Sequence, residues 1–208
     1  MRIIHGTMRG LALGVALLAG EAAAQPAQDP TWPCVQRLVP KLEPGQMWSG
    51  PPLTDVAQPS VALQETARRL TDLKSPPEAL TAAVKEFAAA QPEAERARAL
   101  GDLFWVSLDW LNDERDVVVR GIRRFAENQR QLADKIVAET RELESLQQAA
   151  AGPTAADVAK IDELTTMRQW DTRIFGDRQK SLTLVCDQPV VLEQRAFALA
   201  RLIQEQLP

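Results

Sequence analysis

The sequence predicts an all-α protein: a helical domain with a long antiparallel hairpin, similar to a coiled coil, and an irregular proline-rich N-terminal arm fastened by a disulfide. Three observations lead to this fold class. From Ser60 onward, apolar residues recur every three or four positions, the spacing of one helix face. No proline interrupts the stretch from Asp113 to Ala150. Cys34 and Cys186, the only two cysteines, lie close to opposite ends of the chain.

Residues 1–24 are predicted to be a cleaved signal peptide. A basic start containing Arg2 and Arg9 leads into the apolar stretch 11–20, and the small residues 22–24 resemble a cleavage signal. The apolar stretch is too short to cross a bilayer as a helix. We therefore expect an exported, periplasmic protein with no membrane span in the mature chain.

Lipid attachment is not expected at the predicted cleavage region. A lipoprotein signal needs a cysteine directly after Leu-Ala-Gly, but the residue that follows Gly20 is Glu21. Cys34 lies further along the chain, away from the cleavage region. The sequence therefore predicts an exported protein that is not a lipoprotein.

Composition excludes several classes of function. The formal net charge of −4 at pH 7 argues against nucleic-acid binding and against attraction to anionic lipid. The only histidine, His5, lies in the predicted signal peptide, and the chain has no tyrosine. The predicted mature chain therefore lacks the base of Ser-His-Asp and Cys-His mechanisms. Its two cysteines are too few for the usual structural zinc sites, so we expect no metal and no cofactor.

The N-terminal arm, residues 25–59, is rich in proline, glycine and glutamine and shows no helical period. A turn is expected at Pro44-Gly45. Trp32 and Trp48 are too apolar for a pure linker. Packing on the chain's own helices is the favoured interpretation for Trp48, and an exposed contact with a partner is the alternative.

The helical domain, residues 60–208, should begin with three base helices. Apolar spacing predicts them at 61–74, 76–91 and 92–111. The second boundary is the clearest, because Ser75 is placed to cap the helix, with Pro76 at its first position.

A hairpin over residues 113–180 should follow, built from helices at 113–150 and 155–180. The first helix carries a narrow heptad seam in which Gln129 and Glu139 stand at two apolar positions. The apolar series of the second helix is Val158, Ile161, Leu164, Met167, Ile174 and Phe175. Whether 92–150 is one continuous helix or breaks near Asn112 stays open.

A last base helix is predicted from about Asp187–Pro189 to Leu207. Thr154 and Asp157 resemble a capping box just after the hairpin turn. The short turn makes the two hairpin helices antiparallel neighbours, which places Gln129 opposite the neighbourhood of Gly176 and Cys186 opposite residue 119.

The two cysteines are predicted to form a disulfide. An even cysteine count in an oxidising compartment usually means a disulfide, and two cysteines allow one intramolecular pairing. There is no Cys-x-x-Cys motif to indicate a redox role. The Cys34–Cys186 bond would fasten the arm to the base of the hairpin, so that the tip, about residues 138–166, projects.

Two facing segments of the hairpin, 120–135 and 168–179, are rich in charge. One interpretation is a site for a charged ligand between the helices. The favoured one is a set of cross-helix ion pairs, such as Glu127 with Arg178 or Asp134 with Arg168. The candidate contact residues are Trp48, Arg124, Glu127, Arg130, Asp134, Trp170, Asp171, Arg173, Asp177 and Arg178.

Three hypotheses for function follow. The first is an exported, non-enzymatic protein–protein interaction module, namely an adaptor, accessory subunit or chaperone-like protein that binds another periplasmic or envelope protein. The second is a small-molecule or ion-binding bundle that uses the charged residues between the hairpin helices. The third is a hydrolase that uses carboxylates alone, for which the sequence indicates no pair. Charged groups that converge in one cavity would favour the second hypothesis over the first.

Overall fold

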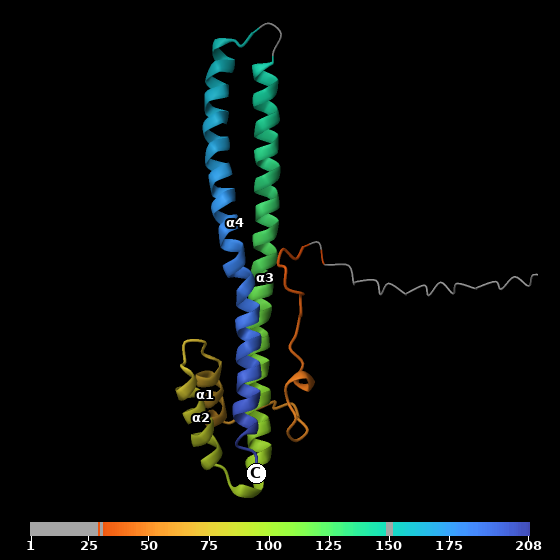
Figure 1. Ribbon diagram of the computed structural model, residues 1–208, viewed down its shortest axis with the longest axis vertical. Coiled ribbons are helices and arrows are strands. Elements are labelled where there is room, and N and C mark those ends of the chain that lie inside the picture. The colour runs from red at the N-terminus through yellow and green to blue at the C-terminus, as the bar shows by residue number, and fades with distance from the viewer. Residues whose placement is uncertain (1–28, 30, 149–151) are drawn as a thin grey trace, which may run out of the picture.

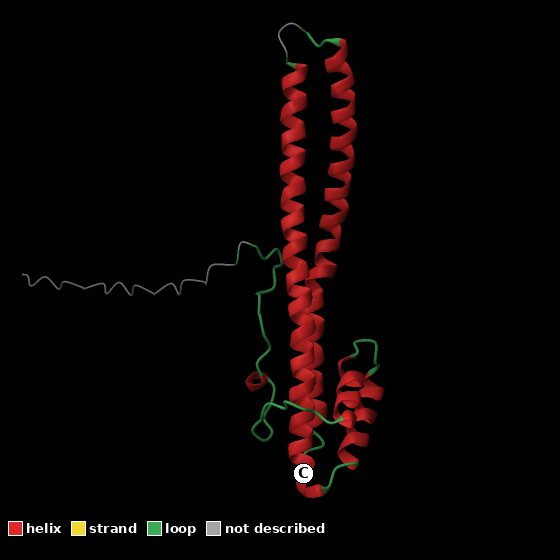
Figure 2. Cartoon of the chain, turned by 180° about the vertical axis from the view of Figure 1, so that it is seen from behind, coloured by secondary structure: helices red, strands yellow, loops and turns green. Residues whose placement is uncertain are grey.

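The computed structural model describes residues 29, 31–148 and 152–208, so the predicted signal peptide lies outside the described residues. These residues form an all-helical fold with no strand among them, as predicted (Figures 1 and 2). The elements are the 3-10 turn η1 (Pro44–Gln46), α1 (Val61–Thr71), α2 (Pro77–Ala89), α3 (Glu93–Gln147) and α4 (Ala155–Gln204).

The hairpin consists of α3 and α4, and each is longer than predicted. The predicted helices 92–111 and 113–150 are one helix of 55 residues, which at ~1.5 Å per residue is about 80 Å long. Asn112 does not break it. The Asn112 side chain is buried and bonds the backbone of the arm, accepting from Leu42 N at 2.8 Å and donating to Leu42 O at 3.1 Å. This polar residue is therefore used for tertiary contact and not as a helix cap.

The prediction of a separate last helix starting at Asp187–Pro189 is wrong, because α4 continues through Pro189. Proline has no backbone N–H, so the carbonyl one turn earlier, on Val185, loses its usual donor. Burial of Cys186 and Leu192 on either side holds both halves of α4 against the rest of the protein. Tertiary packing thus outweighs the local signal for a break.

The helix α2 begins one residue later than expected. Its N-cap is Pro76 and its first residue is Pro77, so the predicted Ser75 cap does not form. Proline has no side-chain acceptor, so the cap of α2 makes no side-chain hydrogen bond to the helix N-terminus. In the α1–α2 turn, the carbonyls of Leu73 and Ser75 accept hydrogen bonds from Arg195 of α4. The Thr154–Asp157 capping box of α4 is confirmed.

The base of the molecule holds the main core. α1 and α2 lie beside the lower halves of α3 and α4, and Figure 2 shows the upper half of the hairpin as two helices alone. The largest fully buried side chains include Leu70, Leu100, Phe104, Leu111, Leu192 and Leu199. The hairpin therefore projects from a compact base, as the sequence predicted.

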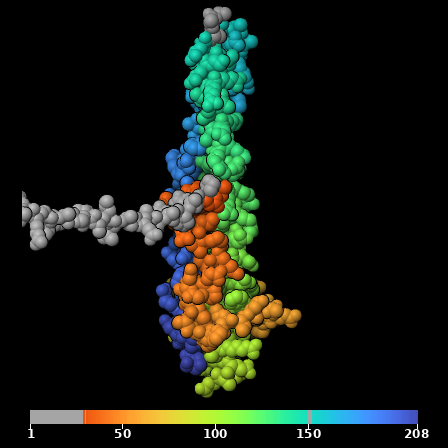
Figure 3. Space-filling view, turned by 90° about the vertical axis from the view of Figure 1, so that its right-hand side faces the viewer, coloured from red at the N-terminus to blue at the C-terminus, as the bar shows by residue number. Residues whose placement is uncertain are grey.

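The arm runs along the lower half of the hairpin in an extended path (Figure 3). Arg115, only 3% exposed, fixes it by donating from Nε to Val39 O at 2.9 Å and from Nη1 to Pro189 O at 2.5 Å. Burial lowers the pKa of Arg115, and Glu193 opposes this effect. One guanidinium thus joins α3 to both the arm and α4.

Replacing Asn112 by alanine should destabilise the protein by about 2 kcal/mol, because it leaves the buried N–H and C=O of Leu42 without partners. We expect a fall of several degrees in the thermal unfolding midpoint and faster amide exchange at Leu42. Asp113→Ala, at an exposed neighbouring position, is the control. An unchanged midpoint in Asn112→Ala would show that these bonds do not hold the arm.

Candidate functional site

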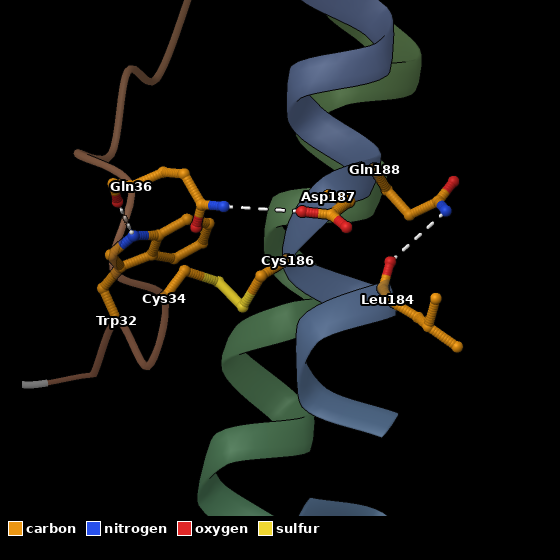
Figure 4. Close-up of a disulfide and its surroundings, with 7 residues drawn as sticks. All are labelled: Trp32, Cys34, Gln36, Leu184, Cys186, Asp187 and Gln188. Atoms are coloured by element: carbon orange, nitrogen blue, oxygen red, sulfur yellow. Dashed lines mark hydrogen bonds between the residues drawn. A yellow bond between two sulfur atoms is a disulfide. The ribbon is translucent and has the colours of Figure 1, made fainter. Parts of the chain in front are cut away.

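The disulfide between Cys34 and Cys186 fastens the arm to α4, as predicted (Figure 4). The two Cα atoms lie 5.6 Å apart, and both cysteines are buried in a small cluster with Ile122 of α3. The expected position opposite residue 119 is confirmed, because Val118 also packs against this cluster. Beside it, Gln36 Nε2 donates to Asp187 Oδ1 at 3.5 Å (Figure 4).

The first described residues of the arm reach the middle of the hairpin. Asp29 pairs with Arg123 of α3 at 2.8 Å. Thr31 donates to Asp29 Oδ1 from its hydroxyl at 2.6 Å and from its backbone N–H at 2.9 Å. These bonds, together with Arg123, lower the pKa of Asp29. The arm therefore contacts both hairpin helices up to this point.

A groove of about 370 Å³ opens between α3 and α4 directly beyond the arm. Thr31 and Pro33 line its lower end. The rest of its wall is formed largely by apolar or small side chains, including Phe125, Ala126, Ala133, Phe175 and Leu182. Arg130 is the one charged residue among those that line it.

The predicted charged contact residues do not converge in this groove. Glu127 pairs with Arg130 of its own helix and not with Arg178. Asp177 pairs within α4, with Lys180 at 3.0 Å and Arg173 at 4.0 Å. Across residues 31–148 and 152–208, no ion pair involves the exposed Arg124, Asp134 or Arg178. The predicted pairs Glu127–Arg178 and Asp134–Arg168 are therefore wrong.

The cross-helix ion pair that does form joins Lys135 of α3 to Asp171 of α4, at 2.6 Å. Hydrogen bonding to Asp171 raises the pKa of Lys135. The same lysine lies 3.6 Å from Glu139, which is 5% exposed. Glu139 accepts no hydrogen bond at either carboxylate oxygen, and Arg168 Nε is also buried without a partner. The seam of the upper hairpin thus buries charged groups that lose contact with water and gain too few hydrogen bonds in return.

An apolar stripe of Met167, Trp170 and Ile174 lies on the exposed surface of α4, and we call it the Trp170 stripe. These three side chains follow one another at spacings of three and four residues, so they share one helix face. Trp170 is 60% exposed. Of the apolar series predicted for this helix, Val158, Met167 and Ile174 are exposed, whereas Leu164 is buried. Outward apolar residues obey the same helical spacing as inward ones, so the sequence pattern did not separate them.

Trp48 belongs to the base and not to an exposed contact. Its ring stacks on Phe104 with centroids 4.7 Å apart, and its Nε1 donates to Pro51 O at 2.8 Å. A Cβ atom at Gly50 would lie 2.6 Å from the Trp48 ring, so only glycine allows this approach. The favoured interpretation of Trp48, packing on its own helices, is confirmed.

Neither a metal cluster nor a membrane span is found in the described part of the chain. No group of three or more His, Cys, Asp or Glu residues there is arranged to hold a metal ion. None of its helices is long and apolar enough to cross a bilayer. Comparisons with protein families, with curated proteins and with solved structures find no match to this chain.

Replacing both Cys34 and Cys186 by serine should lower stability by up to about 5 kcal/mol, because the bond closes a loop of more than 100 residues. The measurement is the denaturant midpoint of the purified protein, with the wild type under reducing conditions as a second test. Equal midpoints for oxidised wild type and double variant would contradict a stabilising role for the bond.

Glu139→Leu should stabilise the hairpin by about 1 kcal/mol or more, since an apolar side chain replaces a buried carboxylate that makes no hydrogen bond. Thermal unfolding of the purified variant measures this change. Glu142→Leu, at an exposed position of the same helix turn, should have little effect. A lower midpoint for Glu139→Leu would show that the carboxylate is a net stabilising group.

Proposed function

We propose that the protein is an exported, non-enzymatic interaction module that binds another periplasmic or envelope protein through the upper half of its hairpin. The single observation that carries this proposal is the Trp170 stripe. Its position on a helix that projects from the base leaves room for a partner protein to approach. An adaptor, accessory subunit or chaperone-like protein would use such a surface.

Its exposed apolar area and its tryptophan favour the Trp170 stripe as a contact surface. Exposing three large apolar side chains on one helix face costs free energy that burial against a partner would recover. Tryptophan is also enriched among residues that dominate binding energy. The remaining exposed apolar residues of α4, such as Leu184 and Val191, are more widely spaced along the helix.

The geometry offers less support for a charged-ligand site. Charged side chains from the two facing segments should converge in one cavity if such a ligand bound there. Instead, Arg130 alone lines the groove, and Glu127 and Asp177 pair with residues of their own helices. The distribution of charge therefore favours the interaction hypothesis over the ligand-binding alternative.

Serine at both Met167 and Trp170 should abolish capture of the natural partner from periplasmic extract by the tagged mature protein. The stripe would lose most of its apolar area, while the exposed positions leave folding intact. Leu184→Ser is the matched control, because Leu184 is 69% exposed on the same helix nearer the base. If both variants capture the same proteins as the wild type, the Trp170 stripe is not the contact surface.

Export can be tested separately from binding. The protein recovered from the periplasm should begin at Gln25, as measured by intact mass and N-terminal sequencing. The same spectrum should show no lipid adduct. Recovery of chains that still begin at Met1, in the cytoplasmic fraction, would contradict the proposed localisation.

A further inference from the structure

The arm follows the groove between the two hairpin helices. Arg115 and Arg123 contact it from α3, while Cys186 and Asp187 contact it from α4. An extended segment that is fixed to both helices lies over the line where they meet. The lower half of the hairpin therefore already binds an extended, proline-rich segment of this chain, namely Asp29 and residues 31–42.

The same groove continues beyond the arm. Thr31 and Pro33 form its lower end, and no described residue of the arm lies further up it. Ala126 and Ala133 stand one heptad apart on α3 and line the groove with small side chains. A peptide backbone can approach closely at such positions. The groove thus extends the surface that the arm already uses.

Two polar groups at this groove could bond a second extended segment: among the described residues, the acceptor of Gln129 has no partner, and the only ion pair of Arg130 is exposed. Gln129 lines it and is 7% exposed, and its Oε1 accepts no hydrogen bond, although its Nε2 donates to Phe175 O at 3.3 Å. A buried acceptor without a donor is unfavourable, and a backbone N–H would satisfy it. Arg130 also lines the groove, held by the exposed and weak pair with Glu127.

The arm shows how a segment engages this edge of α3. Arg123 and Arg130 are seven residues apart, and Arg123 is bound by Asp29 of the arm. Seven helical residues rise about 10 Å, a distance that about three extended residues cover. A carboxylate on a segment that continues the arm's path would therefore reach Arg130. Residues 25–28 contain no acidic residue, so the chain itself cannot supply it there.

We infer that the groove bounded by Thr31, Ala126, Arg130, Ala133 and Phe175 binds an extended, apolar segment of a partner protein that carries a carboxylate for Arg130. This inference rests on the proposed interaction function but uses a different surface. At about 100° per residue, Trp170 lies about 140° around α4 from Phe175. The Trp170 stripe and the groove therefore face different directions and can be tested independently.

The probe is a random 12-residue peptide library displayed on phage and selected against the mature, oxidised protein. Selected peptides should combine apolar residues or proline with an aspartate or glutamate. Synthetic copies should bind about tenfold more weakly to Arg130→Ala, because a charge-assisted bond is lost. Arg141→Ala, an exposed arginine further up α3 and outside the groove, is the matched control.

Ala133→Trp provides a second variant, since the larger side chain would fill the groove, and it should abolish peptide binding. Trp170→Ser should leave peptide binding unchanged, so a failure of the proposed contact stripe is distinguishable from a failure of the groove. No selected peptide, or equal binding by Arg130→Ala and wild type, would overturn the inference. So would a peptide affinity that rises tenfold when residues 25–28 are removed, because the chain's own N-terminal segment would then be the occupant.

Discussion

The rest of the structure depends on the attachment of the arm at the middle of the two long helices. There Cys34 is bonded to Cys186, and one turn away Arg115 bonds Val39 and Pro189 together. These contacts fall beside the proline that would otherwise end α4. The proline's own carbonyl accepts a bond from Arg115, so α3 is tied to α4 at the point where proline removes a backbone hydrogen bond. A buried arginine and a disulfide thus allow a helix of 50 residues to continue through a residue that favours a break.

This attachment divides the hairpin into two halves with different properties. Below it, the arm, α1 and α2 surround the helices, and the core is apolar and fully buried. Above it, two helices pack on each other alone, with Gln129 and Glu139 in their seam. Polar residues at seam positions reduce stability and specify pairing register. The upper half therefore leaves two surfaces exposed for a partner, namely the Trp170 stripe and the groove beyond the arm.

Much of this architecture was predictable from the sequence. Helical spacing and capping residues are local signals, and two cysteines allow only one intramolecular disulfide. The register was predicted to within one residue, since Gln129 bonds the carbonyl of Phe175 where Gly176 was expected. Continuity at Asn112 and Pro189 was not predictable, because both depend on contacts with residues 70 or more positions away. The cross-helix pair of Lys135 with Asp171 was missed for a similar reason. Several acids and bases lay within reach of each other, and side-chain packing selected one pair.

The most direct test of the account is site-specific photo-crosslinking in living cells, with the photoreactive side chain at position 170 or at position 184 of α4. Both positions are exposed; position 184 lies two residues from Cys186, where the arm is attached, and position 170 lies nearer the tip of the hairpin. We expect a discrete crosslinked protein from position 170 and none from position 184. A product from position 184 alone would contradict the claim that the Trp170 stripe carries the contact.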